Sequence, residues 1–422
     1  MKHIGIFQAV VLLGPATVAA AADLNSAPPV AVQSWWDTVS ITGHVEAGLT
    51  ANPASPPDGI NFGHLFTDKA NRFLLNQTVL TIQRPLSTDP SGYDVGFKLQ
   101  TLYGSDARAT QFLGQFDYSI NGLNQFNIVE AYGVAHLPWL TAGGIDVKLG
   151  QFVTLEGAEV IYAPDNLLYS HSYIFNFGIP FKHTGILTTT HVNEVLDVFA
   201  GVVSGVNTTL GRGDNNGSAS FHGGFALNNL LGSGLTITAT TLIGPENPGV
   251  PSISQACLCN PNRSLRYLND VTAVWKASER LVFTTDLNYI KDDGFKADGY
   301  GVAQYVSYAV NDWLKVVVRG EIWRDNKGFF VAAFPGNFDF VNAEYGRPNG
   351  SYSGGRTTYG AVTAGLNLTP TLSENIFGIK QLIIRPEVRY DTSLNGTTPF
   401  GRGTKGSQFT FGGDIIVPFS VK

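Results

Sequence analysis

The sequence has few charged residues, and that shortage excludes two classes of protein. Only 14% of its 422 residues are charged, against about 25% in ordinary globular proteins, so a conventional soluble surface is hard to build. Glycine (48 residues), small polar residues and aromatics (12%) take their place, which argues against charged, disordered tails. The net charge of −6 gives no electrostatic footprint for nucleic acid, and we exclude nucleic acid as the default partner.

Long apolar runs are also missing, and the run at the N-terminus is short. Lys2 and His3 precede the apolar stretch Ile4 to Leu13, and Ala19 to Ala22 offer small-residue cleavage sites, as in a secretory signal peptide. A membrane anchor is the competing interpretation, but the stretch is shorter than the roughly 20 residues that cross hydrocarbon. We expect residues 1–22 to be a signal peptide.

Cysteine is scarce as well, with only Cys257 and Cys259 in the chain. Scarcity of thiols agrees with export to an oxidising compartment. The two cysteines favour a local disulfide over a metal site, because two soft ligands without a nearby histidine are too few for tetrahedral zinc. We expect neither a cofactor nor a metal.

Sixteen segments of the chain alternate apolar and polar side chains with a period of two, which is the pattern of half-buried β-strands. In the segment 39–50, Val45 and Leu49 point one way while His44 and Glu46 point the other. Each of these strands therefore has one apolar and one polar face.

The gaps between the predicted strands alternate in length. Gaps 51–72, 104–124 and 153–180 are long, whereas gaps 84–92, 138–143 and 191–194 are short. An even number of strands with short turns at one rim and long loops at the other is typical of outer-membrane barrels. Such a sheet must close, because backbone groups that face lipid find no water to bond.

The predicted fold class is thus all-β: a transmembrane, antiparallel, up-and-down barrel of about 16 strands. Its short turns would be periplasmic and its long loops extracellular. We expect a periplasmic N-terminal segment over residues 23–38 and the barrel over residues 39–422. Aromatic residues near the strand ends suit the interfacial girdles of such a barrel: Trp139, Trp275, Trp313, Tyr289 and Tyr390.

Several blocks of the sequence carry a resemblance to a known family. They are Lys148 to Glu159 (KLGQFVTLEGAE), Pro164-Asp165-Asn166, Tyr169-Ser170, Gly178 to Phe181, His183-Thr184-Gly185, Tyr300 to Asp325 and Leu382 to Asp391. Together these blocks resemble the OmpL-like family of β-barrel porins of bacterial outer membranes. The resemblance covers most of the mature chain and implies an integral outer-membrane barrel with a porin role.

Charged residues occur on the polar faces of the thirteenth and fifteenth predicted strands. They are Lys315, Arg319 and Glu321 on one strand and Arg385, Glu387, Arg389 and Asp391 on the other. One strand separates the two, so we expect a mixed-charge wall inside the barrel. Such charges either set the ionic selectivity of a water-filled pore or pair with one another and fix the strand register, and the sequence leaves both open.

The long gap 153–180 is too apolar for a loop in solvent, and it also carries Glu156, Glu159 and Asp165. We expect this loop to fold into the barrel, narrow the pore and place the three acids opposite the basic residues of the wall. The alternative is a loop that caps the rim or packs between protomers.

The function expected from these features is that of an outer-membrane porin through which small hydrophilic solutes or ions diffuse passively. The alternative is a surface-exposed barrel with a plugged lumen that serves as an adhesin or structural anchor. An enzyme has little support, because the chain has no G-x-S-x-G motif and its eight histidines lack recognisable partner motifs. The expected partners are outer-membrane lipid, small polar solutes, the barrel-assembly machinery and further copies in a homotrimer.

Overall fold

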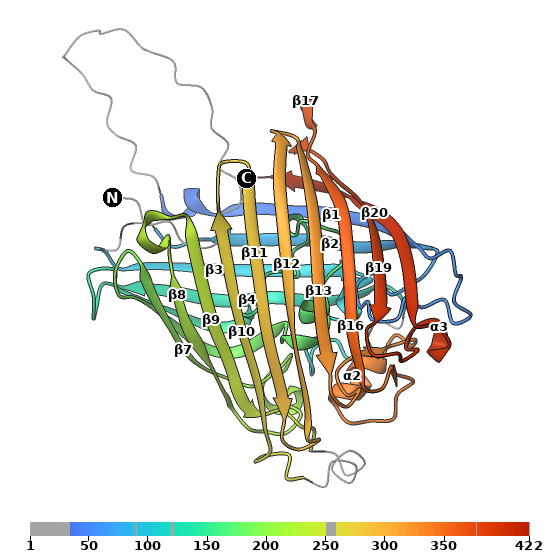
Figure 1. The fold of residues 1–422 in the computed structure, drawn as a ribbon. Helices are drawn as coiled ribbons and strands as arrows, with labels where there is room; N and C mark the ends of the chain where they lie inside the picture. Colours follow the sequence, from blue (N-terminus) through green and yellow to red (C-terminus); the bar gives the residue numbers. More distant parts are fainter. Residues whose placement is uncertain are drawn as a thin grey trace, which may run out of the picture.

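The computed structural model is a closed barrel of sixteen antiparallel strands, in which β20 closes on β1 (Figure 1). It describes residues 34–87, 89, 91–119, 122–249, 259–376 and 378–421. The predicted signal peptide 1–22 and Cys257 lie outside the described residues, so the signal peptide and the disulfide stay predictions.

The barrel strands follow one another in chain order around the ring. Their bounds are β1 Ser40–Ala51, β2 Arg72–Arg84, β3 Asp94–Gly104, β4 Gln125–Leu137, β5 Ile145–Val153, β6 Lys182–His191, β7 Leu196–Val203, β8 Ser220–Leu227, β9 Leu235–Pro245, β10 Leu265–Lys276, β11 Leu281–Asp292, β12 Ala297–Asn311, β13 Leu314–Asp325, β16 Thr357–Leu368, β19 Ile383–Ser393 and β20 Ser407–Ser420. The predicted fold class is confirmed, in strand number as well as in closure.

The remaining elements are short and lie in the connections. They are η1 Trp35–Thr38, η2 Asp106–Arg108, η3 Ala163–Asp165, the π-helical turn η4 Ile174–Gly178, η5 Gly211–Gly213, η6 Leu230–Gly232, β14 Ala332–Ala333, α2 Asp339–Glu344, β15 Tyr352–Ser353, β17 Thr371–Ile376, β18 Ile379–Gln381 and α3 Phe400–Gly403. Among the described residues, no helix has the length and apolarity needed to cross a membrane.

The two faces of each strand have the polarity expected of a sheet surrounded by lipid. On β13, Val318 and Ile322 point outward and are exposed, whereas the polar Arg319 and Glu321 point inward and are buried. The buried face is thus the polar one, the reverse of a soluble sheet. All five of the aromatic residues expected in the interfacial girdles are exposed.

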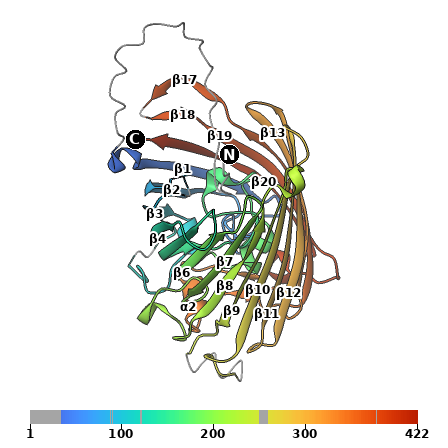
Figure 2. The same ribbon diagram turned by 90° about the vertical axis from the view of Figure 1, so that its left-hand side faces the viewer.

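The two rims differ, as the gap lengths predict. The short turns lie at the rim that carries the C-terminus, and the long loops gather at the opposite rim with α2 and α3 (Figures 1 and 2). The β17–β18 hairpin is the exception, because it projects beyond the barrel at the short-turn rim (Figures 1 and 2). The sequence did not predict it.

Candidate functional site

The candidate site is the inner wall of the barrel together with the loop between β5 and β6, residues 154–181, which we call the inner loop. Its base is closed by a hydrogen bond from Thr154 N to Phe181 O (3.0 Å). Between these ends, Tyr173, Ile174 and Phe175 are buried. Burial of these side chains explains why the loop is so apolar.

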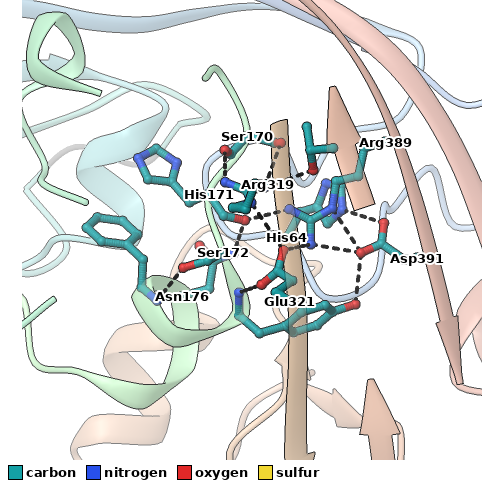
Figure 3. Close-up of polar contacts among 12 residues, drawn as sticks. His64, Ser170, His171, Ser172, Asn176, Arg319, Glu321, Arg389 and Asp391 are labelled. Atoms are coloured by element: carbon teal, nitrogen blue, oxygen red, sulfur yellow. Dashed lines mark hydrogen bonds and ion pairs between the residues drawn. The ribbon is translucent and has the colours of Figure 1, made fainter. Parts of the chain in front are cut away.

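Three wall arginines bind the backbone of the inner loop. All three residues are at most 1% exposed. Each donates Nη1 to loop carbonyl oxygens at 2.6–2.8 Å: Arg319 to Ser170, Arg385 to Ala163 and Asn166, and Arg389 to His171. A guanidinium group suits this role because it carries five donors in a fixed plane and stays charged when buried. Figure 3 draws the contacts of Arg319 and Arg389 with the loop.

Wall carboxylates bind the opposite kind of group, the N–H donors of the same loop. Glu321 on β13 accepts a hydrogen bond from Tyr173 N (2.6 Å), and Glu387 on β19 accepts hydrogen bonds from Tyr169 N (3.0 Å) and Ser170 N (3.1 Å). Backbone donors and acceptors buried away from water must find such partners. The wall side chains thus supply hydrogen-bond partners for the backbone of an irregular loop, which could not be buried without them.

Ion pairs also connect the arginines to carboxylates. Arg319 pairs with Glu159 of the inner loop (2.7 Å) and with Glu321 (3.3 Å), and Arg389 pairs with Glu321 (3.2 Å) and Asp391 (2.8 Å). Burial alone would raise the pKa of Glu159, but the neighbouring Arg319 holds it below its ordinary value. Glu159 is therefore charged at neutral pH.

An apolar cluster lies where the inner loop contacts the other long loops. The ring of Phe66, from the loop between β1 and β2, lies 5.4 Å from that of Phe175 and 5.8 Å from that of Phe181. The ring of His171 stacks on Phe175 at 4.3 Å, and burial lowers its pKa to about 4. Val331, from the loop between β13 and β16, joins the same cluster.

The family model described as "Putative beta-barrel porin-2, OmpL-like" matches residues 38–419 of this chain. The chain belongs to this OmpL-like porin family. The family and the fold indicate the bacterial outer membrane, and they point to a channel rather than an enzyme. No curated protein matches the sequence of this porin.

Solved structures of other porins share the barrel. The anion-selective porin from Comamonas acidovorans has a TM-score of 0.56 at 12% identity, over 90% of this chain and 99% of that one. Salmonella typhi OmpF, in complex with daunomycin, has a TM-score of 0.54 at 10% identity, over 90% and 97%. Pseudomonas putida OprB has a TM-score of 0.53 at 14% identity, over 90% and 94%. At identities this low, the comparison supports a shared fold and nothing more.

Most of the predicted site residues lie close together in the structure, but the three acids of the inner loop do not all face the wall arginines as expected. Of the three loop acids, Glu159 alone contacts a wall arginine. Glu156 lies near Asp270 of β10, which is another acid. Burial raises the pKa of Asp165, opposed by the charge of Lys98 of β3. Glu156 and Asp165 make no ion pair among the described residues, because the path of the loop places them beside Asp270 and Lys98 rather than beside the wall arginines.

Lys315 stands apart from the rest of the mixed-charge wall. It lies one residue from the start of β13, at the short-turn rim, and is exposed. Within the described part of the chain it makes no ion pair, unlike Arg319 and Arg389.

The sequence did not identify every partner of the wall arginines. Arg385 forms ion pairs with Glu46 of β1 (3.2 Å) and with Asp414 of β20, and Asp391 accepts a hydrogen bond from His64 of the loop between β1 and β2 (3.1 Å). Closure of the barrel pairs β1 with β20, which in turn pairs with β19, so Glu46 comes within reach of Arg385 across one strand. The alternating pattern of the sequence predicts that Glu46 lies on a polar strand face, but it does not predict which residue Glu46 pairs with.

Proposed function

We propose that this porin is a passive diffusion channel for small hydrophilic solutes and ions, narrowed by the inner loop. Three anchor points of the loop on the inner wall carry the proposal. Gln77 of β2 donates to Ile161 O (2.8 Å), while Asp270 of β10 accepts from Gly157 N (2.9 Å). The third anchor is the set of wall arginines on β13 and β19.

The positions of these strands in the ring support narrowing. β2 and β10 are eight strands apart in a ring of sixteen, so they face each other across the barrel. A loop hydrogen-bonded to both of them crosses the lumen. A barrel of this size is wide enough to hold an aqueous channel, and such a crossing would leave only part of its cross-section for solutes.

The remaining parts of the proposal concern export and assembly. We propose that residues 1–22 direct export, that residues 23–38 stay on the periplasmic side, and that the barrel-assembly machinery inserts residues 39–422 into outer-membrane lipid. We also propose a homotrimer. The N-terminal pattern and the lipid-facing apolar surface support these steps.

A second candidate function is a plugged barrel that acts as an adhesin or structural anchor. The apolar cluster favours it, because side chains from three long loops, among them Phe66, Phe175 and Val331, pack together with wall residues. Apolar side chains packed in this way exclude water. The two functions differ in whether solutes cross the barrel.

A liposome-swelling assay distinguishes the diffusion channel from the plugged barrel. We expect liposomes that contain the purified protein to swell in small sugars, and the rate to fall steeply as the sugar becomes larger, because the loop restricts the passage. Protein-free liposomes and liposomes with heat-denatured protein are the controls. Swelling no faster than in these controls, with the barrel shown intact by circular dichroism, would favour the plugged anchor.

A further inference from the structure

Three buried carboxyl groups meet where the inner loop contacts β10 and β11. Glu156 of the loop, Asp270 of β10 and Asp286 of β11 are only 2%, 1% and 1% exposed. Asp286 Oδ2 accepts a hydrogen bond from Ala158 N (3.1 Å), and Asp270 Oδ1 accepts one from Gly157 N. We call these three side chains the acidic recess.

The charge of the acidic recess has no counter-charge. Among the described residues, none of the three carboxylates takes part in an ion pair, whereas Glu159 and Glu321 on the other side of the loop both pair with Arg319. A carboxylate buried without a cation is strongly disfavoured, so it must take up a proton or a cation from solution. The recess therefore requires a positive partner that the described residues do not supply.

Unpartnered oxygen atoms point to the same requirement. Both carboxylate oxygens of Glu156 are buried without a hydrogen-bond partner, as are Oδ1 of Asp286 and Oδ1 of the adjacent Asn288. Oxygen atoms of this kind are the ligands that hard cations prefer. No group of three or more His, Cys, Asp or Glu side chains in the described part of the chain is placed to chelate a metal ion.

The wall below the recess leads toward the short-turn rim. Thr272 is the register partner of Asp286, so the two side chains share the inner face of the sheet. Thr284 lies two residues from Asp286 on the same face, nearer the turn. Both threonines are half-buried rather than buried, which leaves hydroxyl-lined wall accessible on this side.

We propose that the acidic recess attracts permeating cations and makes this porin cation-selective. The proposal rests on the proposed channel function and names the class of solute that the channel favours. A cation that enters from the threonine-lined side approaches three carboxyl groups, and the charge of those that are ionised is poorly screened because they are buried. Clefts lined by charge of one sign raise the local concentration of counter-ions about 10-fold or more.

Titration of the recess gives the selectivity a pH dependence. Burial raises the pKa of Glu156 well above its ordinary value, and the nearby Asp270 raises it further. The other charged group that faces the recess, Glu159, is also an acid. Because the raised pKa makes Glu156 take up its proton at a higher pH than an exposed glutamate, lowering the pH neutralises the recess and weakens the preference for cations.

The reversal potential of the purified protein in planar bilayers under a KCl gradient tests the proposal. We expect wild type to prefer K⁺ over Cl⁻, more strongly at pH 8 than at pH 5. In the triple variant Glu156→Gln, Asp270→Asn, Asp286→Asn, the permeability ratio should fall about three- to tenfold. The matched control removes three exposed acids from short turns and should keep the wild-type ratio: Glu194→Gln, Glu279→Gln, Asp312→Asn.

The possible outcomes separate this proposal from the proposed channel function. Silent membranes would overturn both. Open channels that prefer Cl⁻, or a triple variant with the same ratio as the control, would overturn cation selectivity and leave the channel function standing. If the triple variant does not fold, the pH dependence of wild type decides, since a ratio that does not change between pH 8 and pH 5 contradicts the proposal.

Discussion

Deletion of residues 157–176 is expected to raise the single-channel conductance of this porin several-fold. The deletion removes the loop segment whose carbonyl oxygens accept hydrogen bonds from Gln77, Arg319, Arg385 and Arg389, and which we propose narrows the lumen. It also removes the apolar side chains that the inner loop contributes to the apolar cluster. We therefore expect a wider aqueous path through the barrel. Conductance is measured in planar bilayers after circular dichroism has shown that the variant barrel assembles.

The control for this deletion shortens a segment that lies away from the lumen. The β17–β18 hairpin, residues 371–381, projects beyond the short-turn rim (Figures 1 and 2). Its replacement by a short turn should leave the conductance unchanged. An assembled barrel that lacks 157–176 and conducts no better than this control would contradict the narrowing role of the inner loop.

Substitution of Arg389 is expected to have the largest effect on stability. Arg389→Met removes the cation that pairs with Glu321 and Asp391 and the donor to His171 O. Two carboxylates then stay buried with less positive charge beside them, and breaking a buried ion pair from one side costs about 3–5 kcal/mol. Unfolding by guanidinium chloride in detergent micelles measures the loss in the free energy of unfolding.

The matched control is Arg356→Met. Arg356 precedes β16 in a long loop and its side chain is exposed, so its substitution should change the free energy of unfolding by no more than about 0.5 kcal/mol. Adding Glu321→Gln to Arg389→Met should recover part of the loss, because it removes one of the two buried carboxylates that have lost Arg389 and leaves Glu159 as the carboxylate partner of Arg319. Equal stability of the Arg389→Met and Arg356→Met variants would show that the arginine wall does not hold the loop.

The sequence predicts the barrel well because one physical rule governs every strand. Lipid outside and polar groups inside force an alternation with a period of two, as in β13, where exposed Ile322 separates the buried residues Glu321 and Trp323. Loop lengths then identify the two rims. No such rule covers the β17–β18 hairpin, which projects beyond the barrel at the short-turn rim (Figures 1 and 2).

The site was less predictable, because its contacts join residues far apart in the chain. The alternation of apolar and polar residues places Arg319 and Arg389 on the inner face of the barrel. It does not predict which carbonyl oxygens of the inner loop they bind. The acidic recess depends on the path of the inner loop, which sets Glu156 beside Asp270 and Asp286 instead of beside the arginines. An aspartate on a polar strand face is an ordinary feature of a barrel, so the sequence alone did not single out Asp270.

Fold and selectivity are separate properties of this barrel. The Comamonas acidovorans porin, which is described as anion-selective, shares the fold at 12% identity. A shared fold does not fix the ionic preference, which has to be argued from the side chains of each barrel. In this porin the three buried carboxyl groups of Glu156, Asp270 and Asp286 form no ion pair among the described residues, and the proposal of cation selectivity rests on them.

Single-channel recording of the purified wild-type protein in planar bilayers tests the central claim, a water-filled path through the barrel. We expect stepwise currents whose size increases in proportion to the conductivity of the bathing KCl solution. Membranes that stay electrically silent, although circular dichroism shows a β-barrel and the protein is recovered in the bilayer, would contradict it.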